Sequence, residues 1–176
     1  QIEAEQEGEI PLYPESAVAS LLEAVRVVPL GKPISLWDGE IKATFFPVGH
    51  ILGATGIFFE SNEATALLSG DISITDQVTI PGMKMLPLVS PDLVVVESTY
   101  GGRLHANRKA EEKRIVEQAR EIIERKGIML FPAFAVGRAQ EVILILSRAM
   151  EKKEIPTVPL FVDGMVKQVC QIYRSY

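Results

Sequence analysis

Residues 45–71 read FFPVGHILGATGIFFESNEATALLSGD, and residues 93–101 read LVVVESTYG. In these two stretches three apolar runs lead into a polar residue, namely His50, Asp71 and Glu97. In α/β proteins the loops that follow buried strands commonly carry ligand-binding and catalytic groups. Histidine and aspartate are typical zinc ligands, and a carboxylate beside a metal can transfer protons. The pattern therefore predicts a polar site at one edge of a sheet.

Each of these three residues also has a purely structural interpretation. His50 can be a loop histidine with ordinary hydrogen bonds, Asp71 a turn former, and Glu97 a helix cap or salt-bridge partner. Loops select such residues for their turn chemistry alone. Three of them at successive strand ends favour the functional interpretation.

Composition indicates a soluble globular protein of one domain or parts of two, since the 176 residues are 47% hydrophobic and 23% charged. No apolar run reaches the ~18–20 residues of a membrane span, and the polar start does not resemble a signal peptide. The single cysteine, Cys170, excludes an internal disulfide and fits a core position in a protein of the cytoplasm. A net charge of −5 argues against a broad basic surface for nucleic acid, but not against a local basic cleft.

The first hundred residues show hairpin chemistry. Asp38-Gly39 is a strong turn signal, and Asn62 lies between two further β-like runs. The elements expected here are a helix over 14–27, strands over 33–36, 40–46, 55–60 and 64–68, and a long loop over 73–91, after a linker or a frayed start at 1–11.

The pattern changes after Asp92. Residues 93–96 form a continuous apolar run, which is typical of a strand buried on both faces. Asn107 is a suitable N-cap for the helix that follows. The expected elements are helices over 107–126, 137–152 and 164–173, with strands over 128–131 and 158–162. This β-α-β-α-β-α order predicts a parallel sheet with right-handed crossovers, and a domain boundary near 101–106.

Four motifs together resemble a known family. GHILGA (49–54), LLSGD (67–71), VVVESTYGGRLH (94–105) and PAFAVGRAQE (132–141) resemble the β-CASP branch of the metallo-β-lactamase superfamily. Its members are RNA-processing nucleases such as ribonuclease J and the nuclease subunit of the cleavage and polyadenylation specificity factor. FVDGM (161–165) is most similar to the archaeal and bacterial members.

The resemblance implies an α/β fold in two parts. Residues 1–101 would form part of a metallo-β-lactamase αββα fold, and residues 102–176 the first βαβα units of a β-CASP cap domain with a parallel sheet. It also implies a site with two zinc ions, in which His50 is a zinc ligand and Asp71 bridges the two metals. Glu97 matches the acidic residue of the first β-CASP motif, which partners a downstream histidine in proton transfer.

These implied roles agree with general chemistry. A bridging carboxylate holds two cations about 3.5–4 Å apart, a spacing that suits both the attacking and the leaving oxygen of a phosphodiester. A metal-bound hydroxide, with the pKa of its water lowered to about 7, would be the nucleophile.

The chain also departs from the family. The principal metal motif, His-x-His-x-Asp-His, is absent upstream of His50, and only one other histidine, His105, occurs. With His50 and Asp71 alone the three or four protein ligands that each zinc takes are not supplied. We therefore expect an internal fragment of a longer protein, inactive by itself. The alternatives are a degenerate, non-catalytic relative and a split protein completed by another chain.

Three further residues are candidates for RNA or phosphate binding. Arg138 begins a helix, where backbone N–H groups and a guanidinium favour an anion. The equal alternative is an exposed arginine paired with Glu141. His105 and Ser98 follow the strand that ends at Glu97, and both have simpler interpretations as a loop histidine and a turn cap.

The expected function is therefore that of part of a zinc-dependent ribonuclease acting on single-stranded RNA, since a narrow cleft beside buried metals admits single strands. One rival is a non-catalytic scaffold subunit of an RNA-processing complex. Another is a small-molecule hydrolase of the wider superfamily, which the STYG and GRAQE motifs disfavour. Truncation would leave apolar surface exposed, so a homodimer or a complex with other subunits is also expected.

Overall fold

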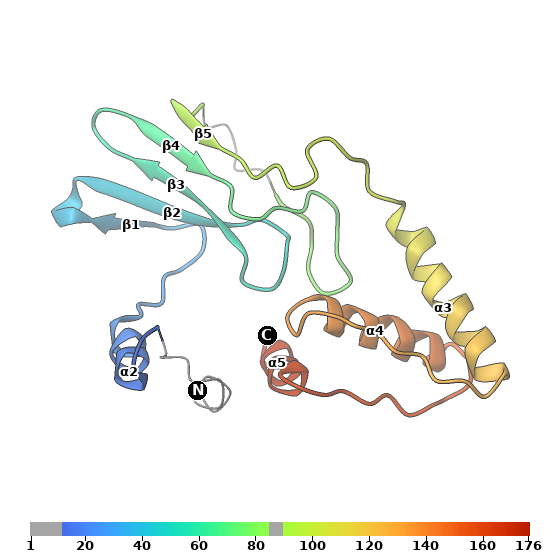
Figure 1. Ribbon diagram of the computed structural model, residues 1–176. Helices are drawn as coiled ribbons and strands as arrows, with labels where there is room; N and C mark the ends of the chain where they lie inside the picture. The colour runs from blue at the N-terminus through green and yellow to red at the C-terminus, as the bar shows by residue number, and fades with distance from the viewer. Residues whose placement is uncertain (1–11, 85–89) are drawn as a thin grey trace.

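The computed structural model describes residues 12–84 and 90–176. The expected linker or frayed start at 1–11 and part of the expected loop over 73–91 lie outside these ranges. Figure 1 shows a twisted sheet on one side, the helical part of residues 108–173 on the other, and a further helix, α2 (Glu15–Ala24), apart from both.

The sheet has five strands in the order β1-β2-β3-β4-β5, antiparallel except for the parallel pair β4 and β5. Pro47 pairs with Thr55, and Leu68 pairs with Val95. The carboxyl ends of β2, β4 and β5 therefore lie at the same end of the sheet. The strand bounds are Pro33–Leu36 for β1, Ile41–Pro47 for β2, Thr55–Glu60 for β3, Thr65–Leu68 for β4 and Leu93–Val95 for β5.

Local sequence signals account for most of these elements. The predicted turn at Asp38-Gly39 is present as a short 3-10 helix, Trp37–Gly39, in which both residues have positive φ. The Asn107 side chain caps the next helix by accepting a hydrogen bond from the Ala110 N–H at 3.1 Å, as predicted. The three predicted helices are α3 (Arg108–Glu124), α4 (Arg138–Glu151) and α5 (Val166–Tyr173).

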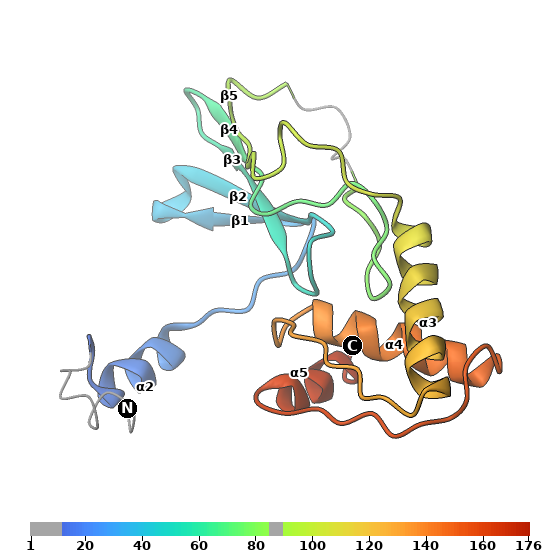
Figure 2. The same cartoon turned by 45° about the vertical axis from the view of Figure 1, so that its right-hand side comes forward.

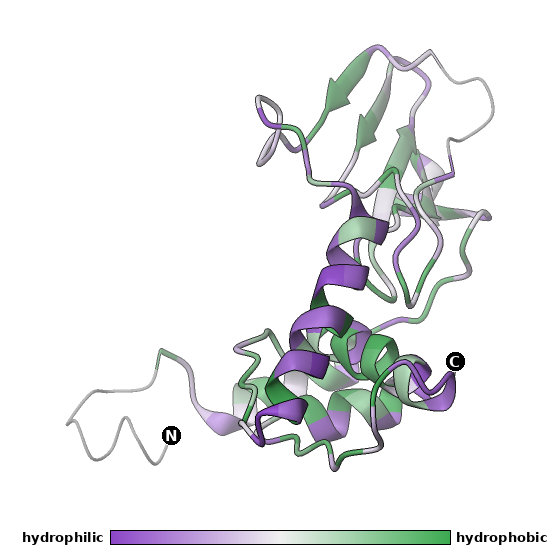
Figure 3. Cartoon of the chain, turned by 90° about the vertical axis from the view of Figure 1, so that its right-hand side faces the viewer, coloured by the Kyte–Doolittle hydropathy of each residue, from purple (hydrophilic) through white to green (hydrophobic). Residues whose placement is uncertain are grey.

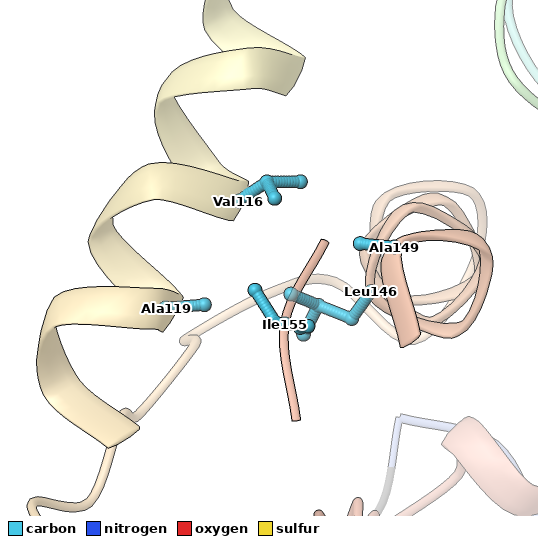
Figure 4. Packing of buried hydrophobic residues seen from close by; sticks show 5 residues of the cluster. All are labelled: Val116, Ala119, Leu146, Ala149 and Ile155. Atoms are coloured by element: carbon cyan, nitrogen blue, oxygen red, sulfur yellow. The ribbon is translucent and has the colours of Figure 1, made fainter. Parts of the chain in front are cut away.

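Two separate apolar clusters hold the described residues together. Phe46 of β2, Phe58 of β3 and Val48 just after β2 form the buried cluster of the sheet, with Ile72 and Met83 packed against them. The second cluster joins α3 to α4, and Figure 4 shows its side chains converging from both helices. Its buried members are Val116, Ala119, Leu146, Ala149 and Ile155. Burial of each large aliphatic side chain stabilises the fold by roughly 1.5–3 kcal/mol.

Helix α3 is amphipathic, as its sequence predicts. In Figure 3 it is mainly hydrophilic, with a narrow hydrophobic stripe, whereas the strands of the sheet are mostly hydrophobic. The buried part of this stripe is Val116 and Ala119, and Ile115 and Ile123 lie half-buried beside them. A polar helix with one apolar stripe packs that stripe on a neighbour and leaves the rest to water.

The predicted parallel sheet of the second part is wrong for the described residues. Segments 128–131 and 158–162 are extended but have no strand partners there, and Ile128 and Phe161 are almost fully exposed. Strand β5 was predicted to be buried on both faces, yet Val94 is 50% exposed. Apolar runs encode strands that can be buried, but burial requires a covering layer, and β5 is an edge strand here.

The sheet and the helices meet through loops. Within residues 12–84 and 90–176, no strand of the sheet packs against α3, α4 or α5. Loop 72–84 lies between the sheet and the N-terminal ends of α3 and α4 in both views (Figures 1 and 2). Among the described helices, none combines the length and apolar character that crossing a membrane requires.

Candidate active site

The loops that carry His50 and Asp71 are paired with each other. Gly49 and Ile72 form an isolated antiparallel bridge. The Ser73 N–H also donates to the Val48 carbonyl at 2.8 Å. His50 and Asp71 are therefore each one residue from a bridged pair, and both side chains are exposed. The structure thus brings together two of the three predicted strand-end residues by backbone pairing.

Glu97 joins the same place through β5. The Ser69 N–H donates to the Val95 carbonyl at 2.9 Å, and the Glu97 N–H donates to Ser69 Oγ at 3.0 Å. The carboxylate of Glu97 then accepts from the Ile72 N–H at 3.4 Å through Oε1. All three predicted residues consequently surround the Gly49–Ile72 bridge at one end of the sheet.

The Glu97 carboxylate is held in its ionised form. The pKa of Glu97 is lowered, first by hydrogen bonds from the backbone and side chain of Thr99, then by the Ile72 N–H, with His50 adding a favourable charge. The Thr99 N–H lies 2.8 Å from Oε2. A carboxylate with a lowered pKa is a weak general base by itself, but it can orient an imidazole and stabilise its protonated form.

The turn before His50 depends on glycine. Gly49 has φ +74°, and a Cβ added there would lie 2.5 Å from the Ser73 carbonyl oxygen and 2.6 Å from the Met83 nitrogen. We expect Gly49→Ala to lower the free energy of unfolding by about 2–4 kcal/mol, from backbone strain and overpacking. Urea unfolding of the chain measures this loss.

Gly53→Ala is the matched control for this prediction. Gly53 also has positive φ, at +82°, but its added Cβ would meet nothing within 4 Å. The expected loss in the free energy of unfolding for Gly53→Ala is only roughly 1–2 kcal/mol, the cost of placing alanine in the left-handed backbone conformation. Equal losses for the two variants would contradict the tight packing of the His50 turn against loop 72–84.

The donor types at this site suit zinc, but their number does not complete a zinc site. An imidazole and a carboxylate are regular zinc ligands, and zinc takes four donors. His50 and Asp71 supply two, and the Glu97 carboxylate is already hydrogen-bonded to Ile72 and Thr99. In the part of the chain that the structure describes, no three His, Cys, Asp or Glu residues gather into a group able to hold a metal ion.

The three residues predicted to contact RNA, Arg138, His105 and Ser98, each have local contacts within the chain. Arg138 pairs with Glu141 at 2.8 Å, which is the structural alternative for this residue, although its side chain is 59% exposed. The His105 ring contacts Tyr100 at a tilt of 52°, with ring centroids 4.4 Å apart, as a loop histidine. The Ser98 carbonyl accepts from the Gly101 N–H at 3.0 Å in a turn. An RNA-binding role for any of them stays a prediction.

Sequence reasoning missed the polar network behind the site. Glu141 was considered only as a partner of Arg138, but it is buried, and Arg108 at the start of α3 also contacts its carboxylate. Gln77 in loop 72–84 accepts hydrogen bonds from both arginines. The helical pattern of α4 gave no signal for this burial, because Glu141 is two positions from the inward residue Ala139 and so lies on another side of the helix.

Similarity to individual proteins shows that the chain belongs to the β-CASP branch of the metallo-β-lactamase superfamily, as its motifs predicted. No family model matches the chain. Individual proteins do. An RNase J-like protein of Methanocaldococcus jannaschii is 34% identical over 140 residues, which is 78% of this chain and 33% of that protein. Cleavage and polyadenylation specificity factor subunit 3 of Dictyostelium discoideum is 36% identical over 167 residues, which is 94% of this chain and 21% of that protein.

A third relative has a different named role. Transcription termination factor FttA of Methanosarcina mazei is 32% identical over 179 residues, which is 98% of this chain and 28% of that protein. The chain therefore spans a third or less of the length of these relatives. The similarity extends across the sheet and the helices alike.

Proposed function

We propose that this chain forms part of a metal-dependent ribonuclease that hydrolyses phosphodiester bonds of single-stranded RNA. The observation that carries the proposal is the convergence of His50, Asp71 and Glu97 around the Gly49–Ile72 bridge. The names of relatives, among them RNase J-like protein and Endoribonuclease YSH1, support this reaction class.

In this proposal His50 and Asp71 hold two zinc ions, together with ligands from sequence outside these 176 residues. The metals, when bound, supply Lewis acidity to the phosphate and an activated water. Asp71 precedes Ile72, which pairs with Gly49 and donates its N–H to Glu97, and a carboxylate at this position could be shared by two cations. Glu97, held ionised by Thr99 and Ile72, would orient a proton-transferring histidine supplied, like the missing ligands, by sequence outside these 176 residues.

The proposed domain division follows the same reasoning. Strands β1 to β5 would be part of the lactamase half, residues 1–101, and α3 to α5 would begin the β-CASP cap, residues 102–176. RNA would pass between them, near loop 72–84. A cytoplasmic location and assembly as a homodimer or within an RNA-processing complex belong to the same proposal. The names of two relatives, subunits of the cleavage and polyadenylation factor and of the Integrator complex, support the latter.

The experiment is a cleavage assay on a longer protein that contains these 176 residues. Labelled single-stranded RNA is incubated with the protein as purified, after EDTA treatment, and after zinc is returned. We expect cleavage that EDTA abolishes and zinc restores, with a duplex of the same sequence cut much more slowly. Intact RNA in every condition would leave the non-catalytic scaffold as the better account.

The 176-residue chain by itself should hold no zinc pair and cleave no RNA. Two metals need about six to eight protein donors, and the strand ends offer only His50, Asp71 and Glu97. Elemental analysis and the same RNA assay on the purified chain measure both. Near-stoichiometric zinc with EDTA-sensitive cleavage would contradict the assignment of the ligands.

A further inference from the structure

Glu141 is a buried carboxylate that two other segments and its own helix contact. Its side chain is 6% exposed. Oε1 accepts from Arg108 of α3 at 2.8 Å and from the Val78 N–H of loop 72–84 at 3.2 Å, and Oε2 accepts from Arg138 at 2.8 Å. A buried carboxylate is stable only when charged partners and hydrogen bonds satisfy it, as they do here.

The positive charges of Arg108 and Arg138 keep the Glu141 carboxylate ionised. Burial raises the pKa of Glu141, but hydrogen bonds from Arg108 and Arg138 and their charges outweigh this effect, so the pKa lies below its ordinary value. Gln77, next to Val78, extends the network by accepting from both guanidinium groups. Loop 72–84 is therefore attached to α3 and α4 through two consecutive residues.

The network continues to the strand-end site. Gln77 Nε2 donates to Ser73 Oγ at 2.9 Å, and the Ser73 N–H donates to the Val48 carbonyl at 2.8 Å. Ser73 is two residues from Asp71, and Val48 is two residues from His50. A continuous chain of hydrogen bonds thus runs from Glu141 to the loops that carry both proposed metal ligands.

The loop that follows His50 also touches the helical part. Gly137, the N-cap of α4, lies against the Ile51 side chain. A Cβ added to this glycine would be only 2.7 Å from Ile51 Cγ2. The Leu52 N–H lies 3.4 Å from the Tyr173 hydroxyl of α5. Since no described strand packs on α3 to α5, these loop contacts set the position of the site relative to the helices.

We propose that Glu141 is a positioning residue that fastens loop 72–84 to the starts of α3 and α4, and so holds Asp71 and His50 in register with the helical part. In Glu141→Gln one oxygen can still accept, but the amide NH2 that replaces the other cannot accept from a guanidinium or from the Val78 N–H, and the charge that attracts both arginines is lost. Loop 72–84 then opens locally, while the apolar cluster between α3 and α4, which contains Val116 and Leu146, stays packed.

The test is amide hydrogen exchange of the 176-residue chain, followed by NMR. In Glu141→Gln we expect the Val78 amide to exchange at least about 10-fold faster, while amides of Val116 and Leu146 change less than about twofold. Glu111→Gln is the matched control, because Glu111 forms an exposed ion pair with Arg114 on α3. It should leave both regions unchanged.

Two outcomes would overturn the proposal. One is an unchanged Val78 amide in a folded Glu141→Gln chain, and the other is equal acceleration throughout, which would make Glu141 a general stabilising residue. If Glu141→Gln fails to fold, Gln77→Ala decides. This variant keeps the carboxylate paired but removes the adjacent attachment, so faster exchange over 72–84 supports the proposal and no change refutes it.

A second test, which measures kcat and KM for RNA cleavage, rests on the proposed function. In the longer protein, Glu141→Gln should lower kcat about 10-fold or more with KM and zinc content nearly unchanged, because misplaced groups slow the chemical step. Glu141→Asp, which keeps the charge, should recover part of the loss, and an unchanged kcat in Glu141→Gln would overturn the catalytic consequence. If the unmodified protein cleaves no RNA, the proposed function fails, while the exchange result still judges the role of Glu141.

Discussion

Replacing Asp71 with alanine in a longer protein that contains this chain should abolish RNA cleavage and lower its zinc content. Asp71 lies three residues after β4 ends at Leu68, and one residue from the Gly49–Ile72 bridge that brings the His50 turn beside it. A carboxylate shared by two cations stabilises both, so its loss removes the charge that keeps them close together. The expected loss of activity is the largest of any single substitution considered, on the order of 10⁴-fold or more.

Elemental analysis and the labelled-RNA assay measure the two effects on the same preparation. Asp76→Ala is the matched control, since Asp76 lies five residues further along and accepts one loop hydrogen bond from the Gly82 N–H at 2.9 Å. It should keep both zinc and activity. Full activity with two zinc ions per chain in Asp71→Ala would remove Asp71 from the site.

Glu97→Gln should separate proton transfer from metal binding. Glutamine keeps an oxygen able to accept from Ile72 or Thr99 but loses the negative charge that stabilises a protonated histidine. We expect cleavage to slow by about 10²–10⁴-fold, the usual contribution of a positioned acid–base group. Zinc content should stay close to that of the unmodified protein.

The control for this variant is Glu60→Gln. Glu60 ends β3 at the opposite end of the sheet, where it pairs with Thr65 and Lys42. Its removal should leave cleavage unaffected. If Glu97→Gln instead loses as much zinc as Asp71→Ala, Glu97 is a metal ligand rather than a partner of the proton-transferring group.

The parts of the fold that local chemistry determines could be predicted from the sequence. The Asp38-Gly39 turn and the Asn107 cap set the positions of β2 and α3, because each acts through bonds to residues nearby in the chain. Strand β3 has the predicted bounds, since its apolar run ends at a turn. The candidate site was found because all three of its polar residues lie two or three positions after a strand ends.

Contacts between distant segments could not be predicted in this way. The Gly49–Ile72 bridge joins residues 23 positions apart, and no local pattern encodes it. The burial of Glu141 depends on Arg108 and Val78, which belong to two other segments. The apolar run 93–96 signals burial, but the sequence does not say whether a covering layer is present, so the predicted environment of β5 was wrong.

The central claim is that the ends of β2, β4 and β5 form a metal centre for RNA hydrolysis. Anomalous diffraction at the zinc absorption edge, from crystals of an RNA-cleaving longer protein, tests it most directly. We predict zinc peaks about 2.0–2.2 Å from a ring nitrogen of His50 and from the carboxylate oxygens of Asp71. Zinc bound only elsewhere, in a protein that still cleaves RNA, would contradict the claim.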